Sequence, residues 1–534
     1  MSTLSPSSLY EMVLGNLSGG RPGGLPPVRP SASVIPWRQG AAGIEVYWIR
    51  RADAQPFMGG WHAFPGGGLA RADATLPVCG TPSGAGEGPP AAGFPAALRE
   101  PDVDPGPDLV PGLVAAALRE LFEEAGLLLA TPAPDPSRLA EARRALLAQE
   151  AGFAEILTGL GATLDASRLV WAGRWVTPPF APLRFDNRFF LLEWPATEDL
   201  QPAFHPGECA EGEWIPPAQA LERVWRGDGL TAPPILHILE VLRQQGPTAG
   251  LGRLRDPSET NLGPLRKIEL RPGVLLFPLL THTLPPALTT NTILLGTGEA
   301  VLIDPGSPLD AENERLECAL AVARERLGRR VTAIWLTHHH PDHVGGVTRL
   351  RASLGVPVLA HPETAGRLAA RGLTIDGTLT DGQKIILAGE PPLEVTVVHT
   401  PGHARGHLCF LEEAGRSVVA GDLIAGLGTI VIDPPEGDMD DYLGSLAKLA
   451  ALRPGTLFPA HGPAVKDALG KLREYIDHRL WREEKVLAAW SRGLRTPEEM
   501  LPTVYEDVPK EAHPLAARQI LAHLERLRRS GRLE

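Results

Sequence analysis

The spacing of apolar residues along the chain predicts strands in some segments and helices in others. Partial alternation of apolar and polar positions predicts a strand within residues 33–51, and apolar residues at helical spacing predict a strong helix over residues 112–129. Further strands are expected within residues 170–195, and a further helix over residues 235–245. The first half of the chain is therefore expected to contain both kinds of element.

The second half of the chain shows a more regular succession of elements. Glycine and proline interrupt residues 246–264, and apolar strands restart at residues 274–278 and 292–303. Strand and helix patterns then alternate as far as residue 461, which predicts a layered α/β domain. Residues 471–534 are charged and mostly helical in pattern.

Composition narrows the class of protein. The chain has 534 residues, enough for about three domains. Its hydrophobic fraction of 43% and charged fraction of 21% exclude a wholly disordered chain. A stretch rich in Pro and Gly, about residues 79–111, is expected to form a loop insertion. The chain is thus divided into an N-terminal extension (1–30), a first domain (31–245), a linker (246–265), a second domain (266–470) and a helical tail (471–534).

Charge and cysteine content bear on partners and compartment. The net charge of -12 provides no overall basic field for nucleic acid, although a local basic groove stays open. The four cysteines form no CxxC pair, so a reducing compartment is expected. The first 21 residues lack the pattern of a signal peptide, and no apolar run approaches the ~20 residues that span a bilayer. We therefore expect a soluble, cytoplasmic protein with no membrane partner.

Three glutamates share one face of the first predicted helix. Glu120, Glu123 and Glu124 are spaced i, i+3 and i+4, and Gly126 is placed to end the helix. Carboxylates packed together repel one another unless a positive charge lies between them, and their oxygens suit Mg²⁺ or Mn²⁺. The alternative is a solvated acidic face with ordinary ion pairs, such as one between Arg119 and Glu123.

This helix and the segment before it resemble the signature of the Nudix hydrolases, GX5EX7REUXEEXGU. Residues 119–127 fill the second half of that signature without exception. In its first half, Gly67 is followed at the family's spacing by Asp73, where the family usually has Glu. The distance from Asp73 to Arg119 is far longer than in the family, so the insertion interrupts the signature. An insertion costs little free energy when its ends stay close.

The interruption resembles one branch of the Nudix hydrolases, the coenzyme A diphosphatases, which carries a long insertion in the same place. Residues 184–186, Arg-Phe-Asp, and the two phenylalanines that follow also resemble that branch. The resemblance covers about residues 30–245. It implies hydrolysis of a diphosphate in a nucleotide-like or coenzyme A-like small molecule.

The same resemblance implies the roles of individual carboxylates. Mg²⁺ or Mn²⁺ would be held by Glu120, Glu123 and Glu124, and the last two are expected to be catalytic. Gly67, Asp73, Arg119 and Gly126 would shape the site. A further carboxylate outside the signature often acts as the base in this family. The candidates, which stay open, are Asp186, Glu211 and Glu213.

A histidine-rich segment follows an apolar strand predicted at residues 331–336. The string THHHPDHVGG places His338, His340, Asp342 and His343 within six residues. Imidazole together with carboxylate suits zinc and other borderline metals. The alternative is a surface run of histidines, which the specific spacing HxHxDH disfavours.

Three further candidate ligands each follow a predicted strand. They are His403, Asp422 and His461, in the strings TPGH, AGD and PAHG. With the histidine-rich segment, and with Asp304 in the upstream string LIDPG, they resemble the five-motif pattern of the metallo-β-lactamase fold. This resemblance implies an αβ/βα sandwich and two metal ions, either Zn²⁺ or else Mn²⁺ or iron.

The metallo-β-lactamase resemblance also implies how the ligands divide. One ion would take His338, His340 and His403, the other would take Asp342, His343 and His461, and Asp422 would bridge both. A water shared by the ions would be deprotonated near neutral pH and become the nucleophile. Asp342 is expected to take part in catalysis.

Three further residues lie near these motifs, and none of them is expected to bind metal directly. His399 and His407 flank His403, and each is expected either to orient a ligand or substrate phosphate or to be an ordinary loop histidine. Cys409 lies on a predicted strand and is expected in the core.

The charged tail resembles a small winged-helix module. The string YIDHRLWRE at residues 475–483, and a succession of helices with a final strand at residues 531–533, resemble the β-lactamase-like protein 2 family. That family contains zinc-dependent endoribonucleases, so the resemblance, over residues 266–534, implies a single-stranded RNA partner. Alternatives are a tail that only packs on the core or that forms a homodimer contact. The arginines that would face phosphate are Arg479, Arg482, Arg526, Arg528 and Arg529.

Together these resemblances imply a multidomain, bifunctional metallohydrolase. A Nudix α/β/α sandwich would cleave a diphosphate, and a metallo-β-lactamase αβ/βα sandwich with a winged-helix-like module would cleave a phosphodiester. Two alternatives stay open. The second domain could instead be a thioesterase of the glyoxalase II type, because the string at residues 401–407 occurs in both groups. The first domain could only bind a ligand and regulate the second.

Overall fold

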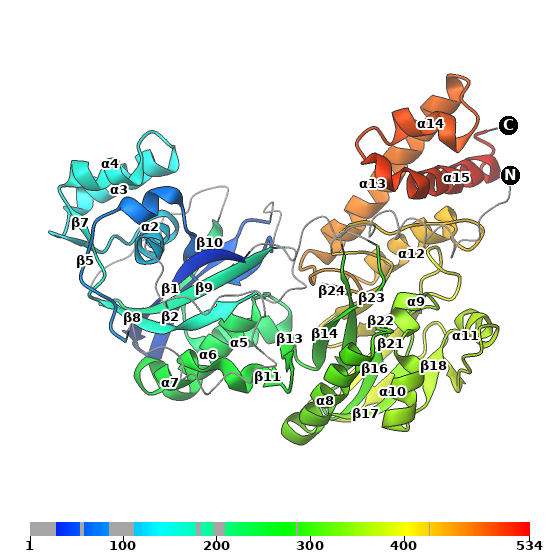
Figure 1. The fold of residues 1–534 in the computed structure, drawn as a ribbon, viewed down its shortest axis with the longest axis horizontal. Coiled ribbons are helices and arrows are strands. Elements are labelled where there is room, and N and C mark those ends of the chain that lie inside the picture. Colours follow the sequence, from blue (N-terminus) through cyan, green and yellow to red (C-terminus); the bar gives the residue numbers. More distant parts are fainter. Residues whose placement is uncertain are drawn as a thin grey trace. The chain divides into compact units, whose positions relative to one another are not determined.

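The computed structural model describes residues 28–53, 58–84, 112–177, 183–195, 209–284, 287–426 and 428–533. The chain forms two compact units, of which the first contains Leu25–Asn261 and the second contains Leu262–Glu534 (Figure 1). Residues 1–27 of the expected extension and residues 85–111 of the expected insertion lie outside the described residues.

A mixed β-sheet forms the centre of the first unit. Its main strands lie in the order β10-β2-β1-β9-β8, in which β1 and β9 are parallel and the other neighbours are antiparallel. Short strands β3 and β4 pair with β2 and β1. The bounds are β1 Val28–Gly40, β2 Gly43–Arg51, β3 His62–Ala63, β4 Gly66–Gly68, β8 Leu169–Val176, β9 Arg184–Glu193 and β10 Cys209–Ile215.

Buried side chains alternate between the two faces of this sheet. Val34 and Tyr47 join one apolar cluster, whereas their chain neighbours Ile35 and Val46 join another. This is the period of two expected of a strand that is buried on both faces. Helix α2 packs into the first cluster, and α5 and α6 pack into the second, so the unit is a helix–sheet–helix sandwich (Figure 1).

The remaining elements of the first unit are helices and a small second sheet. The helices are α2 Leu113–Ala125, α3 Pro136–Leu147, α4 Phe153–Leu160, α5 Pro217–Arg226, α6 Pro233–Ala249 and α7 Leu251–Arg255, with 3-10 turns η1 Arg71–Thr75 and η3 Pro257–Thr260. The small sheet has the order β5-β7-β6, with β5 Val78–Cys79, β6 Ala130–Thr131 and β7 Thr163–Asp165. The segment expected as a linker therefore contains the end of α6 and all of α7.

Two β-sheets lie face to face in the second unit. Their orders are β13-β14-β15-β16-β17-β18-β19 and β20-β21-β22-β23-β24. The rings of Trp335 on β17 and Phe410 on β22 have centroids 5.1 Å apart, so side chains of the two sheets are in contact.

The strands of the second unit have the following bounds. The first sheet has β13 Ile268–Arg271, β14 Val274–Leu280, β15 Thr289–Leu295, β16 Glu299–Ile303, β17 Arg330–Trp335, β18 Val358–Ala360 and β19 Gly377–Thr378. The second has β20 Lys384–Leu387, β21 Leu393–His399, β22 Leu408–Glu412, β23 Ser417–Gly421 and β24 Thr456–Pro459. Short strands β11 Asn261–Leu262 and β12 Leu265–Arg266 precede them in the chain.

Helices cover the outer face of each sheet. Leu316 of α8 packs in one cluster with Phe277 of β14, and Leu446 of α12 packs in another with Leu411 of β22. The two sheets thus lie between two helical layers, as in an αβ/βα sandwich. The helices are α8 Asp310–Leu327, α9 Pro341–Val344, α10 Val347–Leu354, α11 Pro362–Ala369 and α12 Met439–Ala451.

Three helices with an apolar cluster of their own end the chain: α13 Ala468–Ser491, α14 Pro497–Val504 and α15 His513–Arg529, with the 3-10 turn η4 Lys510–Ala512. The strand expected at residues 531–533 is wrong, because this described segment is not extended. The amides of Arg532 and Leu533 instead donate to the carbonyl of Leu527, which closes the end of α15.

None of the helices within the described ranges is long and apolar enough to cross a membrane.

The expectation that the arginines of the tail face phosphate is wrong for two of them. Arg479 and Arg482 are each only 2% exposed. The side chains of Arg526 and Arg529 pair with aspartates at the N-terminal end of α12. Much of the basic charge of the tail is therefore neutralised within the second unit.

A buried carboxylate ties α13 to α15. Glu483 is 1% exposed and accepts hydrogen bonds from Arg526 at 2.5 Å and from Arg532 at 2.9 Å. Nδ1 of His523 lies 3.6 Å from the same carboxylate. Burial alone would raise the pKa of Glu483, but His523 and Arg526 outweigh it and lower the pKa below its usual value. The cluster therefore stabilises the charged form of Glu483.

We expect Glu483→Gln to lower the local stability of α15 by about 3–5 kcal/mol at neutral pH, because it leaves buried cations without their partner. Since the folded-state pKa of Glu483 is lowered, its contribution is complete above the unfolded pKa of about 4.3 and is lost as the pH falls through the folded pKa. Hydrogen exchange of the α15 amides measures both effects. In the exposed control Glu484→Gln the change should stay below about 0.5 kcal/mol, and equal losses in both variants would contradict the prediction.

Candidate functional site

Strand ends of the second unit carry the side chains expected to bind metal. Strands β16 and β17 are parallel in one sheet, and β23 and β24 are parallel in the other. The carboxyl ends of parallel neighbours lie at the same edge, so the loops that follow can converge. The seven side chains are His338, His340, Asp342 and His343 after β17, His403 after β21, Asp422 after β23 and His461 after β24.

His338, His340 and His403 form the first group of potential ligand atoms. Nδ1 of His340 lies 2.9 Å from Nε2 of His338 and 2.9 Å from Nε2 of His403. One nitrogen of each ring lies within 4.8 Å of the other two. The three rings are close enough to share one ion.

Asp342, His343 and His461 form the second group. Nε2 of His461 lies 3.5 Å from Oδ2 of Asp342, and Nε2 of His343 lies 3.9 Å from Oδ1 of Asp342. These donor atoms also lie within 4.8 Å of one another. A third set, His338, His343 and Asp422, meets the same criterion and connects the two groups.

Asp422 lies between the two groups. Its Oδ1 is 3.5 Å from Nε2 of His343 and 3.4 Å from Nε2 of His461. Its Oδ2 is 3.5 Å from Nε2 of His403. One oxygen of this carboxylate therefore faces each group, which is the arrangement required of a bridging ligand.

The chemistry of this cluster fits bound cations. Nε2 of His343 and Oδ1 of Asp422 are buried and make no hydrogen bond. Burial and neighbouring imidazoles lower the pKa of His338 and His340 well below the usual range, so both rings are neutral and can donate a lone pair. Burial also opposes charge on His343, but three surrounding aspartates outweigh it and raise the pKa of His343 well above its usual range. A divalent cation would neutralise this excess of negative charge, and nitrogen and oxygen donors suit zinc, manganese or iron.

Asp304 orients one of these rings, a role that its string LIDPG alone did not indicate. It follows β16 with a φ of 49°. Its Oδ2 lies 2.8 Å from Nδ1 of His343, and its carboxylate accepts hydrogen bonds from the backbone N–H and the hydroxyl of Thr337 at 2.8 and 2.6 Å. Nδ1 of His343 donates to this carboxylate, which leaves Nε2 directed to the cluster.

His407 holds the backbone of Asp422, which is one of the two roles expected for it. Its Nε2 accepts the Asp422 N–H at 3.0 Å, so the ring proton is on Nδ1 and is donated to the Thr400 hydroxyl at 2.8 Å. Burial lowers the pKa of His407 to about 3. Gly421 has a φ of 49°, and a Cβ there would lie 2.6 Å from Nε2 of His407. Only glycine fits this contact.

His399 and Cys409 have surroundings of a different kind. His399 stacks on His361 with ring centroids 4.1 Å apart, and its Nε2 lies 2.8 Å from the carbonyl oxygen of Arg405. Cys409 is fully buried in an apolar cluster, which confirms that it belongs to the core.

In the first unit, Arg119 connects the two parts of the signature that the insertion separates in sequence. Its guanidinium bonds Asp73 at 2.8 Å, Glu120 at 2.9 Å and Glu123 at 3.2 Å. Asp73 is 46 residues away in sequence, and it also accepts the backbone N–H of Ala70 at 2.8 Å as a cap of η1. A cation of the protein itself therefore lies among the carboxylates that would otherwise repel one another.

The three glutamates of α2 do not share one set of contacts. Glu120 and Glu123 both meet Arg119, whereas Oε2 of Glu124 accepts the backbone N–H of Gly66 at 2.8 Å. Gly67 lies so close to α2 that a Cβ would be 2.3 Å from Oε1 of Glu120. Gly126 ends α2 in the left-handed conformation, as predicted.

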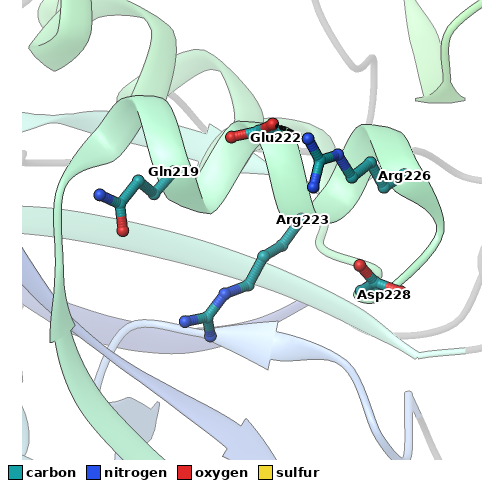
Figure 2. A pocket seen from close by; sticks show the side chains of 5 residues that line it. All are labelled: Gln219, Glu222, Arg223, Arg226 and Asp228. Atoms are coloured by element: carbon teal, nitrogen blue, oxygen red, sulfur yellow. Dashed lines mark ion pairs between the residues drawn. The ribbon is translucent and has the colours of Figure 1, made fainter.

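The three candidates for the general base of the first unit are all engaged by arginine. Their ion pairs are Asp186 with Arg174, Glu211 with Arg50 and Glu213 with Arg223. The last of these adjoins a surface hollow beside α5 (Figure 2). The hollow is lined by Gln219, Glu222, Arg223, Arg226 and Asp228. Arg226 pairs with Glu222, so both arginines of the hollow are neutralised by carboxylates.

Known families match three consecutive parts of the chain. The NUDT19 Nudix domain matches residues 28–243, the metallo-beta-lactamase superfamily residues 285–461, and the beta-lactamase associated winged helix domain residues 496–534. The beta-lactamase-like protein 2 homolog of Drosophila melanogaster is 31% identical over 266 residues, which cover 47% of this chain and 86% of that protein. The chain belongs to the metallo-β-lactamase superfamily.

Other relatives and solved structures are similar to one half of the chain or the other. The lactamase-like protein adaB of Aspergillus niger is 33% identical over 42% of this chain and 69% of its own length. A metallo-β-lactamase family protein from Thermus thermophilus is 28% identical, covers 49% of this chain and 95% of its own, and has a TM-score of 0.40. A Nudix hydrolase from Alicyclobacillus acidocaldarius is 29% identical, covers 44% of this chain and 99% of its own, and has a TM-score of 0.35.

The three family matches confirm the fold expected from the sequence. The chain consists of a Nudix hydrolase domain, a metallo-β-lactamase hydrolase domain and a C-terminal winged helix. The metallo-β-lactamase domain contains the clusters of histidine and aspartate described above.

We expect Asp304→Asn to weaken Zn²⁺ binding by the metal-free protein about 10- to 100-fold, because the amide holds the His343 ring less firmly than the carboxylate does. Competition with a chromophoric chelator measures the affinity. Asp310→Asn is the matched control, since Asp310 is exposed and pairs with Arg349 at the surface of the same domain. Equal affinity in both variants would refute the role assigned to Asp304.

Proposed function

We propose that this chain is a bifunctional metallohydrolase whose metallo-β-lactamase domain uses two metal ions to cleave a phosphodiester in an RNA-like substrate. The observation that carries the proposal is the position of Asp422, whose two oxygens face the two ligand groups at 3.4–3.5 Å. The first ion would be held by His338, His340 and His403, and the second by Asp342, His343 and His461.

The residues of the domain would divide the work as follows. Two divalent cations would supply Lewis acidity, which lowers the pKa of water and stabilises negative charge on the scissile group. Neutral His338 presents a nitrogen lone pair to the centre. Nε2 of His343, oriented by Asp304, would do the same once a cation takes the place of its proton. We assign to the carboxylate of Asp342 the acceptance of a proton from the attacking water and its delivery to the oxygen of the leaving group. Oδ2 of Asp342 lies 3.5 Å from Nε2 of His461.

The choice of a phosphodiester is supported by the order of the domains. A winged helix follows the metallo-β-lactamase domain, and relatives with the name beta-lactamase-like protein 2 homolog align with this half of the chain. The resemblance to that family implies single-stranded RNA. A thioester is the alternative substrate, since the string at residues 401–407 is found in thioesterases of this fold as well.

For the Nudix domain we propose hydrolysis of a diphosphate in a nucleotide-like molecule, with coenzyme A as the first compound to test. Mg²⁺ or Mn²⁺ would be held by Glu120, Glu123 and Glu124. The proposal is supported by the contact of Arg119 with Asp73 across the insertion, because it brings the two separated halves of the signature together.

Product analysis by mass spectrometry tests both halves at once. The wild type, Glu124→Gln and Asp342→Asn are each incubated with coenzyme A, an acyl-coenzyme A, NADH and a short single-stranded RNA, in Mg²⁺ and trace Zn²⁺. We expect RNA cleavage to fall at least about 100-fold in Asp342→Asn alone, and formation of 3′,5′-ADP to fall similarly in Glu124→Gln alone. Each variant is thus the control for the other.

Other outcomes would contradict specific parts of the proposal. Release of free thiol from acyl-coenzyme A that depends on Asp342, with the RNA left intact, would establish a thioesterase in place of a nuclease. If no product depends on Glu124, the Nudix domain is a binding module or acts on a different compound.

A further inference from the structure

One metal-ligating ring is oriented by a loop between β23 and α12. The carbonyl oxygen of Val431 lies 2.7 Å from Nδ1 of His403, so this nitrogen carries the proton and donates it. Nε2 of the ring is thereby directed to the cluster, where it lies 2.9 Å from Nδ1 of His340 and 3.5 Å from Oδ2 of Asp422. The orientation of His403 depends on where this carbonyl lies.

The loop has no regular structure of its own to hold that carbonyl. Residues 428–433 are neither helix nor strand, so no ladder of backbone hydrogen bonds positions them. Ile430 and Ile432 on either side of Val431 are buried in the apolar cluster beneath α12 and α13. Apolar contacts fix the depth of the loop but do not fix the direction of a peptide group.

Arg479 of α13 supplies the missing polar contacts. Its Nη2 donates to the carbonyl oxygen of Ile430 at 2.5 Å and to the hydroxyl of Thr429 at 3.3 Å. Its Nη1 donates to Oε1 of Gln519 on α15 at 3.2 Å, and Nε2 of Gln519 lies 3.5 Å from the same Ile430 oxygen. The peptide group next to Val431 is thus held by two helices of the tail.

The burial of Arg479 makes this contact specific. Its side chain is 2% exposed, and its guanidinium lies 5.4 Å from the ring centre of Tyr442 on α12. A planar guanidinium can hold several acceptors in fixed directions, whereas the ammonium of a lysine is a point charge. Tyr475, one turn earlier on α13, donates to the carbonyl oxygen of Ala425 at 3.2 Å in the same stretch of chain. Successive turns of α13 therefore hold the segment that leads from Asp422 to α12.

We propose that Arg479 is a positioning residue for the metal centre, which it reaches through the peptide group of residues 430 and 431 and the ring of His403. This inference rests on the proposed metal site. It gives the tail a role in the metallo-β-lactamase domain that does not require contact with nucleic acid. It also explains why Arg479 is buried, whereas an arginine that binds phosphate would be exposed.

Arg482 provides a matched control on the same helix. It is also 2% exposed, but its hydrogen bonds go to the carbonyl oxygen of Val504 and to Asp507 within the tail. Loss of Arg482 removes a buried arginine without touching the loop that carries Val431. Any effect that comes only from a weakened tail should therefore be at least as large in this variant.

The test is Zn²⁺ affinity, measured on the full-length, metal-free protein by competition with a chromophoric chelator. Wild type, Arg479→Met, Arg479→Lys, Gln519→Met and Arg482→Met are compared at a temperature at which circular dichroism shows each to be folded. We expect Arg479→Met to weaken one of two bound Zn²⁺ ions about 10- to 100-fold, with a smaller loss in Arg479→Lys and Gln519→Met. Arg482→Met should bind both ions as the wild type does. Where Arg479→Met does not fold, Gln519→Met carries the comparison.

Replacing Zn²⁺ by Co²⁺ makes the coordination geometry of each ion measurable by visible absorption. The visible absorption of one of the two bound Co²⁺ ions should change in Arg479→Met and not in Arg482→Met. Wild-type affinity and spectra in Arg479→Met, or equal losses in Arg482→Met, would overturn the positioning role. A wild-type protein that binds no Zn²⁺ would instead overturn the proposed metal site itself.

Discussion

The position of Asp422 is the constraint on which the cluster of potential ligands depends, because its two oxygens face both groups of these atoms. The backbone of Asp422 fixes that position, because its N–H donates to Nε2 of His407. The preceding residue, Gly421, is in the left-handed conformation. His407 can accept this hydrogen bond only as a neutral ring. Burial keeps it neutral, since its pKa is lowered to about 3. A histidine outside the two ligand groups thus fixes the position of Asp422.

The side chains of the histidine and aspartate cluster could be found from the sequence because each lies in a short string directly after a strand, and strand ends converge in a layered α/β fold. The groups that orient them could not be found in the same way. Backbone carbonyl groups hold Nδ1 of His403 and of His461, and every residue of a chain has such a group. Asp304 was visible as part of a string, but its contact with His343 spans 39 residues and requires the fold.

The layered architecture was predictable for a similar reason, since alternation in strands and apolar stripes in helices are local patterns. The errors concern features that local pattern does not determine. The end of the chain closes α15 with its amides where a strand was expected. Arg479 and Arg482 look like a basic surface in the sequence, yet both are buried, because carbonyl and carboxylate acceptors from distant segments meet them. Charge in a sequence does not tell which charges face solvent.

The ion pair of Asp73 and Arg119 has a consequence for how the Nudix domain can vary. These two residues are 46 positions apart, and their ion pair holds the middle of α2 beside η1. Closing a loop of twice the length costs only about 0.6 kcal/mol more. The length of chain between β5 and α2 can therefore change at little cost in free energy, while Asp73 and Arg119 still hold Glu120 and Glu123 in place.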